Sequence, residues 1–269
     1  MTLRITILGC GASPGVPRIG NDWGACDPEE PRNRRSRCSI LIERIGNDGG
    51  RPTRVLVDTG PDMRSQLLAA NAGFIDAVVY THAHADHTHG IDDLRAFWQN
   101  TGRLVDVFAD ASTFASLSRA FSYCFREAPG SGYPPILQYR PIAPGVPFTV
   151  EGGGGPLTLL PFRQIHGDID TLGLRADGFA YSCDVSDIPS ESLQHVSNLD
   201  LWLVDALRYR PHPSHFSVEQ ALAWIARLTP RRALLTHLHS DLDYATLAGD
   251  LPRGVEPAYD GLVIDLGGA

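Results

Sequence analysis

The sequence is poor in cysteine, and the few cysteines present do not form a framework. There are five, an odd number, and they are widely spaced without any C-x-x-C pair. This pattern is typical of free thiols in a reducing compartment rather than of a disulfide scaffold. The first residues, Met1 to Leu8, alternate like a strand and lack the apolar core of a signal peptide. We therefore expect a cytoplasmic protein.

The sequence also lacks long apolar runs and an excess of positive charge. No run approaches the about 20 residues that span a bilayer, so we expect no membrane association. The net charge of -8 argues against a general nucleic-acid-binding surface, and no stable nucleic-acid complex is expected. A chain of 269 residues can bury a core without disulfides or metals as staples. No linker or internal repeat divides it, so we expect a single domain over residues 1–269.

The densest group of metal-ligand residue types lies between positions 81 and 87. His82, His84, Asp86 and His87 follow directly on the apolar run Ala77–Tyr80, which predicts a buried strand. His82 and His84 are two positions apart, so in extended backbone their side chains point the same way. Imidazole nitrogens and carboxylate oxygens are the ligands that Zn2+ and similar ions prefer. The motif therefore predicts a divalent-metal site at the carboxyl end of a strand, where open α/β sheets bind ligands.

The same arrangement, an apolar strand followed by a ligand-type residue, recurs three times. His166 follows the strand predicted at 157–162, and His237 follows the one at 233–235. Asp184 follows the second arm of a hairpin predicted around Asp177-Gly178. If these strands align, their ends meet at one edge. Five histidines and two aspartates can complete two adjacent metal sites.

Two further aspartates also end predicted strands, Asp58 and Asp205. A metal-bound imidazole usually donates its second N–H to a carboxylate. We expect both aspartates to orient ligands rather than to bind metal themselves.

Two regions are predicted to be loops that contribute to substrate contacts. Residues 17–37 are rich in proline and arginine and lack periodicity, and Arg34 and Arg35 near their end could contact an anionic substrate. A solvated arginine-rich face is the alternative. Residues 129–147 are rich in glycine and proline, and whether they form a lid or shape a pocket is left open by the sequence.

Helices are predicted at several positions, the most relevant of which follows His215. Ser217 and Gln220 have the spacing of a capping box, and apolar residues then recur at helical intervals. Free N–H groups at such a helix start favour anions. Further helices are predicted over residues 63–70, 91–98, 112–125 and 244–247.

Taken together, the cluster from His82 to His87 with the later ligand-type residues resembles the signature of the metallo-β-lactamase-fold hydrolases. The resemblance covers essentially the whole chain. It implies an α/β fold (α+β in some schemes) built as a four-layered αβ/βα sandwich. It also implies two divalent metal ions: one on His82, His84 and His166, a second on Asp86, His87 and His237, with Asp184 bridging both.

Within that family the chain is similar to the branch containing phosphoribosyl 1,2-cyclic phosphate phosphodiesterase. The similarity rests on the Gly9-x-Gly11 turn, the arginine stretch before Cys38, the Asp58-Thr59-Gly60 turn and the segment from Ser214 to Ser217. It implies a catalytic histidine at His215 and assigns Asp86 to catalysis as well as to metal binding. The branch carries a structural zinc on three early cysteines. Here only Cys26 remains, with Asn21 and Trp23 at the other two positions, so no structural zinc is expected.

These expectations combine into one functional hypothesis. The chain would hydrolyse a small cyclic phosphate or nucleotide-like phosphodiester through a hydroxide held between two cations, with His215 protonating or stabilising the leaving group. The cations would be Zn2+ or Mn2+, and Fe2+ also suits mixed His and Asp ligands. The expected partner is a small anionic phosphodiester, and a homodimer is left open. Alternatives on the same core are lactone, thioester or β-lactam hydrolysis, tRNA 3′-end processing, and a non-catalytic cofactor-handling role.

Overall fold

Two seven-stranded sheets form the centre of the fold in a computed structural model that describes residues 1–127 and 129–267. The first sheet has, in spatial order, β14 (Val263–Leu266), β1 (Thr2–Gly9), β2 (Ser39–Ile45), β3 (Thr53–Val57), β4 (Ala77–Val79), β5 (Val105–Ala109) and β6 (Leu137–Pro141). The second has β13 (Val255–Pro257), β12 (Arg232–Thr236), β11 (Leu201–Asp205), β10 (Phe179–Ser182), β9 (Ile169–Ala176), β8 (Leu157–His166) and β7 (Phe148–Val150).

Each sheet has an antiparallel half and a parallel half. In the first sheet, β14 to β3 pair antiparallel and β3 to β6 pair parallel. In the second sheet, β7 to β10 pair antiparallel and β10 to β13 pair parallel. Parallel strands place their carboxyl ends at one edge of a sheet, so β4 ends at the same edge as β3 and β5, and β10 ends at the same edge as β11 and β12.

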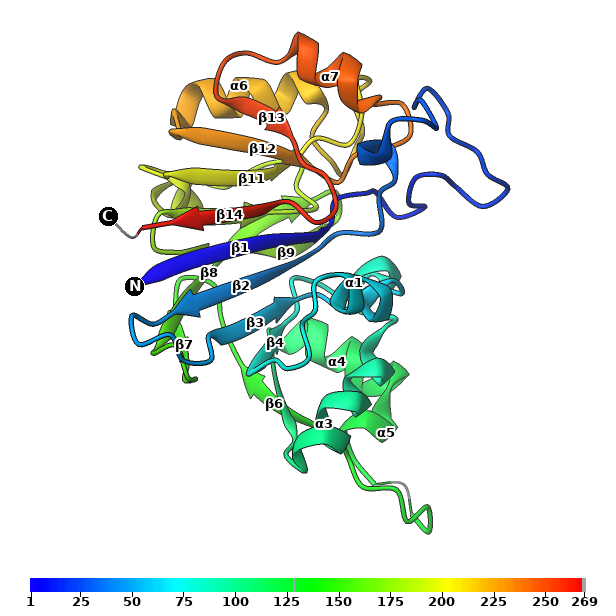
Figure 1. The fold of residues 1–269 in the computed structure, drawn as a ribbon, viewed down its shortest axis with the longest axis vertical. Coiled ribbons are helices and arrows are strands. Elements are labelled where there is room, and N and C mark those ends of the chain that lie inside the picture. The colour runs from blue at the N-terminus through cyan, green and yellow to red at the C-terminus, as the bar shows by residue number, and fades with distance from the viewer. Residues whose placement is uncertain (128, 268–269) are drawn as a thin grey trace.

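Helices cover the outer face of each sheet and complete four layers. On the first sheet lie α1 (Met63–Ala69), α2 (Ala85–Thr88), the 3-10 turn η2 (Ile91–Leu94), α3 (Arg95–Thr101), α4 (Ala111–Ala120) and α5 (Ser122–Phe125). On the second lie η3 (Ser190–Val196), α6 (Val218–Leu228) and α7 (Tyr244–Asp250), and η1 (Pro31–Asn33) interrupts the early loop. The predicted αβ/βα sandwich is confirmed (Figure 1).

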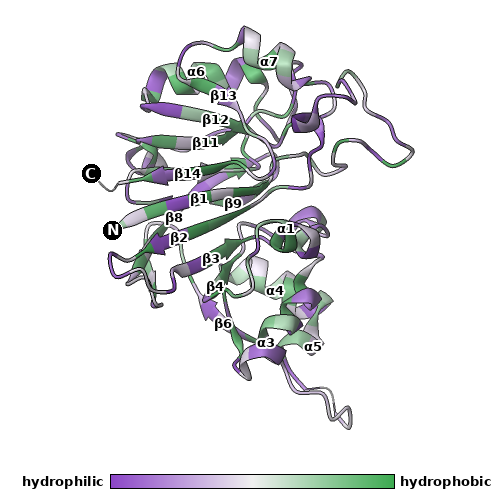
Figure 2. Ribbon diagram, viewed as in Figure 1, coloured by the Kyte–Doolittle hydropathy of each residue, from purple (hydrophilic) through white to green (hydrophobic). Residues whose placement is uncertain are grey.

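Three apolar cores hold these layers together. Between the sheets, Ile5, Ile7 and Val57 of the first pack with Tyr181 and Leu203 of the second. Two outer cores join each sheet to its helices. Successive side chains of β1 point to opposite faces, so Leu3, Ile5 and Ile7 join the core between the sheets while Leu8 joins the outer core. Figure 2 shows the corresponding distribution, with apolar strands inside and polar loops outside.

Most predicted elements are present, and the differences are local. The helix predicted over residues 112–125 is broken at Phe121, where φ is -126°, into α4 and α5. The helix predicted over 91–98 begins as the 3-10 turn η2 and continues as α3 to Thr101. The capping box at Ser217 and Gln220 is confirmed, since both of its hydrogen bonds form. Strands β7 and β13, each three residues long, were not predicted.

Residues 129–147, predicted to be a loop, include the edge strand β6, which pairs with β5. The part around Gly130 to Tyr133 projects from the helical layer beside α3 and α5, away from the main body (Figure 1). Ser131, Tyr133 and Pro134 instead line a separate cavity of about 540 Å³ with Trp98 and Tyr123. A role of this segment as a lid is therefore not supported. Among residues 1–127 and 129–267, no helix combines the length and apolarity needed to cross a bilayer.

Among the contacts that join the early loop to the segment around α7, the Asp243 carboxylate makes several. Asp243 caps α7 by accepting from Thr246 N at 3.0 Å, and it also accepts from Asp27 N at 3.0 Å and Asn33 Nδ2 at 2.6 Å. Partial burial raises the pKa of Asp243, but these hydrogen bonds outweigh that effect and lower it to about 2. Ionised Asp243 therefore stabilises the folded state.

We expect Asp243→Ala to lower the free energy of unfolding by about 1–2 kcal/mol at pH 7, the usual cost of losing an N-cap. Because the folded pKa lies below the ordinary carboxyl value, this difference should be complete above pH of about 4 and disappear as the pH falls towards 2. Urea titrations at several pH values measure it. The control is Glu29→Ala, an exposed carboxylate on the same loop, which should change stability by less than about 0.5 kcal/mol. Equal effects of both changes would contradict the assignment.

Candidate metal centre

The ligand-type residues predicted from the sequence meet where the two sheets end side by side. His82, His84 and His87 follow β4 of the first sheet. His166 is the last residue of β8, and His237 directly follows β12, both in the second sheet. Asp184 comes two residues after β10. All seven predicted ligands, with Asp86 on α2, fall into groups whose donor atoms lie within 4.8 Å of one another.

The first group combines His82, His84 and His166 with one oxygen of Asp184. Asp184 Oδ2 lies 3.7 Å from His82 Nε2 and 3.7 Å from His166 Nε2. His84 is exposed, whereas the other three are buried. The group thus draws side chains from both sheets and is open to solvent on the His84 side.

The second group combines Asp86, His87 and His237 with the other oxygen of Asp184. Asp184 Oδ1 lies 3.1 Å from His87 Nε2 and 3.5 Å from His237 Nε2. Asp86 Oδ2 lies 3.6 Å from His87 Nε2 and 4.0 Å from His237 Nε2. The two oxygens of one carboxylate therefore face two different sets of imidazoles.

These donors fit divalent cations. The Nε2 atoms of His82, His87 and His237 are buried and have no hydrogen-bond partner within the described residues. A buried polar atom without a partner costs about 1–3 kcal/mol, so three of them pointing into one space indicate that a ligand is needed there. Nitrogen and carboxylate oxygen donors in this number suit a pair of divalent metal ions.

The electrostatics of the metal-free side chains agree with this. Burial raises the pKa of Asp184, but the neighbouring His237 and His87 lower it by more than burial raises it. The pKa of this carboxyl therefore lies well below its usual range. Burial lowers the pKa of His237, but Asp184 and Asp86 raise it to about 10. Burial and the neighbouring His87 lower the pKa of His82, leaving a neutral imidazole with a free lone pair. The negative charge of Asp184 is thus balanced by protonated histidine, and a bound cation would replace those protons.

A set of surrounding contacts orients the imidazoles. His87 Nδ1 donates to Asp58 Oδ2 at 2.7 Å, and Asp58 also accepts from Thr81 N and Oγ1, each at 2.8 Å. The Nδ1 atom of His166 donates to the carbonyl of Ser214. Asp58 thus lies against a ligand-type histidine and not in the groups of donor atoms.

His215 lies beside the centre and is held by Asp205. Its Nδ1 donates to Asp205 Oδ2 at 2.7 Å, and that oxygen also accepts from Val185 N at 3.1 Å. On the other side of the ring, His215 Nε2 is 3.9 Å from Asp184 Oδ2. The ring stacks on His237 with centroids 4.5 Å apart. His215 therefore presents Nε2 to the metal centre and Nδ1 to a buried carboxylate.

The two arginines predicted to reach substrate differ in position. Arg35 is buried, with 1% of its surface exposed, and its guanidinium donates to Asn33 Oδ1 at 3.1 Å and to the His239 carbonyl at 3.3 Å. Its guanidinium is thus engaged by protein groups, and a substrate contact of Arg35 stays a prediction. Arg34 is exposed and lies over the Trp23 ring at 5.1 Å.

Cys183 lies at the centre although the sequence pattern did not predict it there. The Cys183 thiol donates to Asp184 Oδ1 at 3.0 Å and lies within 4.8 Å of the donor atoms of Asp184 and His87. Neighbouring residues of an extended strand point to opposite faces, so this contact was not expected. It forms because Asp184 adopts the left-handed conformation, with φ of 51°.

We expect Asp184→Asn to lose most bound metal, because it removes the one charge that faces both groups. The measurement is metal content per chain by mass spectrometry after purification without added metal. Asp168→Asn, an exposed carboxylate in the β8–β9 turn, serves as the matched control and should retain wild-type metal content. Full metal occupancy in Asp184→Asn would contradict the arrangement described above.

Comparisons with known proteins agree with the fold. Residues 53–238 match the family model described as beta-lactamase superfamily domain. The crystal structure of a diphosphatase from the PhnP family is 33% identical with a TM-score of 0.87, covering 99% of this chain and 98% of that one.

Two curated relatives are also similar in sequence. An octanoyltransferase of Porphyromonas gingivalis is 36% identical over 264 residues, which is 97% of this chain but 51% of that protein. A ribonuclease Z of Bradyrhizobium sp. is 30% identical over 148 residues, 53% of this chain and 44% of that protein. The chain spans about half the length of the curated relatives that it matches.

Proposed function

Since the chain belongs to the metallo-β-lactamase superfamily of hydrolases, we propose that it is a two-metal phosphodiesterase acting on a small cyclic phosphate or nucleotide-like phosphodiester. The observation that carries the proposal is the position of Asp184. Its two oxygens face two imidazole groups, and His215, supported by Asp205, stands beside it.

The residues proposed to hold the cations are those of the two groups. His82, His84 and His166 would hold one, Asp86, His87 and His237 the other, and Asp184 would contact both. When bound, two divalent ions would lower the pKa of a water so that it can react near neutral pH. They would also supply positive charge beside the phosphate oxygens. We propose Zn2+ or Mn2+, with Fe2+ also compatible with the donors.

The chain's own acid in this proposal is His215. Because Nδ1 is engaged with Asp205, the second nitrogen is free to carry a proton towards a leaving oxygen at the centre. The 8% exposure of His215 limits competition from bulk water.

Phosphorus chemistry is favoured over acyl chemistry by the relatives. The similar structure is named a diphosphatase and one curated relative a ribonuclease Z, and both names denote cleavage at phosphorus. The name octanoyltransferase denotes acyl transfer, but it belongs to a protein about twice as long as the match. Lactone or thioester hydrolysis, tRNA 3′-end processing and non-catalytic cofactor handling remain the alternatives on the same core.

The remaining properties are proposed with the function. A small anionic phosphodiester would be the partner, without a stable nucleic-acid complex. The chain would act in the cytoplasm as one domain over residues 1–269, and a homodimer is compatible with this proposal.

A substrate panel tests the reaction class. We expect the metal-loaded protein to hydrolyse bis-p-nitrophenyl phosphate and at least one cyclic nucleotide. It should turn over a lactone, an octanoyl thioester and nitrocefin at least about 100-fold more slowly. An active site stabilises the transition state of its own reaction more strongly than the transition states of other reactions. Preference for the thioester or lactone would replace the proposal by acyl chemistry. No activity at full metal occupancy would favour the cofactor-handling role.

Replacing His215 by Ala tests the acid role. We expect kcat on the phosphodiester to fall about 100-fold to 10,000-fold, the usual contribution of general acid catalysis, with metal content unchanged. His195→Ala, on η3 and outside every ligand group, should keep wild-type turnover. Normal turnover in His215→Ala would remove its acid role, and loss of metal in that variant would assign His215 to the metal groups instead.

A further inference from the structure

A cavity of about 540 Å³, here termed the aromatic pocket, is formed by α3, α5 with the residue that follows it, and the segment 131–134 (Figure 1). None of the seven metal-ligand residues lines it, nor does His215. Binding sites for small molecules usually have volumes of about 300–1,000 Å³. The aromatic pocket therefore has room for one small molecule outside the metal centre.

Three aromatic side chains line the aromatic pocket, and their rings have accessible faces. Trp98 is half-buried and packs against the outer core of the first sheet. Tyr123 and Tyr133 are 46% and 75% exposed. Within the described residues none of these three rings stacks on another, whereas Phe114 nearby stacks on Tyr139 with centroids 3.6 Å apart. Accessible aromatic faces of this kind stack on flat rings such as nucleotide bases.

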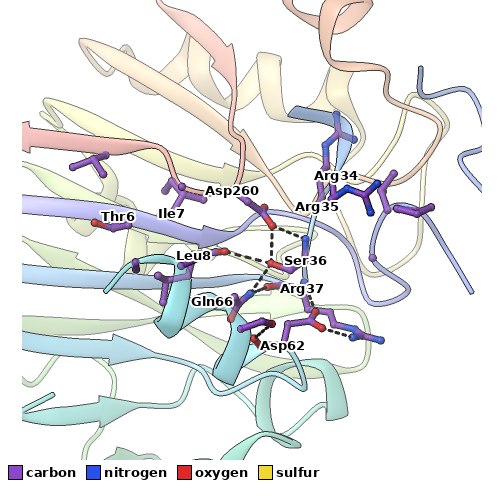
Figure 3. A pocket seen from close by; sticks show the side chains of 18 of the residues that line it. Thr6, Ile7, Leu8, Arg34, Arg35, Ser36, Arg37, Asp62, Gln66 and Asp260 are labelled. Atoms are coloured by element: carbon purple, nitrogen blue, oxygen red, sulfur yellow. Dashed lines mark hydrogen bonds and ion pairs between the residues drawn. The ribbon is translucent and has the colours of Figure 1, made fainter. Parts of the chain in front are cut away.

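The charged side chains of the aromatic pocket are all positive. Arg95 and Arg126 line it and no carboxylate does, although the whole chain has a net charge of -8. Arg95 pairs with Asp92 at 2.7 Å, whereas Arg126 is exposed and forms no ion pair within the described residues. In the larger cavity beside α1, by contrast, Arg37 already pairs with the lining carboxylate Asp62 (Figure 3). The guanidinium of Arg126 is thus available to an anion.

Two uncharged polar side chains of the lining can hydrogen-bond the edge of a ring. Gln99 is exposed on α3, and its amide group both donates and accepts. Ser131 Oγ accepts from Tyr133 N at 3.2 Å, and its O–H remains able to donate. Nucleotide bases carry donors and acceptors on their edges, so these two side chains match a base as well as its flat face is matched by the aromatic rings.

The same lining disfavours two other kinds of ligand. Groups of aromatic rings also bind cations such as quaternary ammonium ions, but Arg95 and Arg126 would repel a cation here. A purely apolar molecule would cover the guanidinium of Arg126 and the amide of Gln99 without offering them hydrogen bonds, which is costly. A planar ring joined to an anionic group satisfies both the aromatic and the charged side chains.

We propose that the aromatic pocket binds a nucleoside 5′-monophosphate, with its base stacked on Trp98 and Tyr133 and its phosphate paired with Arg126. The proposal goes beyond the hydrolytic function, because it holds whichever reaction the metal centre catalyses.

Fluorine NMR of the metal-loaded protein labelled with 5-fluorotryptophan tests this binding locally. The chain has four tryptophans, and the variants Trp98→Phe and Trp23→Phe assign two of their resonances. Adenosine 5′-monophosphate should shift the resonance of Trp98. Trp23 lies against Arg34, which lines the larger cavity, and reports binding there instead. Adenosine lacks the phosphate and should bind about 10-fold more weakly. An unshifted Trp98 resonance at saturating nucleotide would overturn the proposal.

Two pairs of variants test the contacts. Arg126→Ala should weaken the affinity read from Trp98 about 10-fold or more, whereas Arg119→Ala, which removes an exposed arginine of α4 outside the lining, should stay within about twofold of wild type. Tyr133→Ala should weaken binding about 5-fold or more, and Tyr133→Phe, which keeps the ring, should not. An unchanged resonance of the buried Trp202 shows that each variant is folded. Equal affinities within either pair would contradict the assigned contacts.

Discussion

The centre of this protein depends on one buried carboxylate that is shared between two groups of histidines. Asp184 is 2% exposed, and each of its oxygens faces imidazoles that come from both sheets. Burying a lone carboxylate is costly, and so is crowding histidines that share positive charge. When the carboxylate and the histidines lie together, their opposite charges offset both costs. Cations can replace the protons that the histidines carry. Contacts between Asp184 and histidines of both sheets therefore stabilise the edge where the sheets meet, and the same side chains form the site.

The supporting structure is arranged around that carboxylate in a similar way on both sides. Asp58 fixes His87 at the end of the first sheet, and Asp205 fixes His215 at the end of the second. Three site residues, Asp58, Asp184 and His237, have positive φ values of 62°, 51° and 58°. Non-glycine residues adopt this conformation at a cost that surrounding contacts must meet, and such positions cluster at functional sites. The strands thus end in turns that aim side chains inward.

The groups of metal-ligand residue types do not by themselves identify a substrate. Proteins named diphosphatase, ribonuclease Z and octanoyltransferase all share similarity with this chain, so the common core does not by itself select one reaction. Selection must come from what surrounds the centre. In this chain those parts include the segment around His215, whose Nε2 lies 3.9 Å from Asp184 Oδ2.

The sequence by itself determined most of the strands, the ligand-type residues that follow them and the capping box at Ser217, because apolar periodicity and short spacings are local properties. Tertiary structure alone decided which side chains meet. The arginine-rich loop left open whether Arg35 reaches a substrate or solvent, and only the folded chain shows that it is buried and donates to the distant His239 carbonyl. Cys183 contacts Asp184 only because of a left-handed backbone, and His166 joins His82 only because two sheets pack. Contacts between distant segments depend on that packing, which no local pattern encodes.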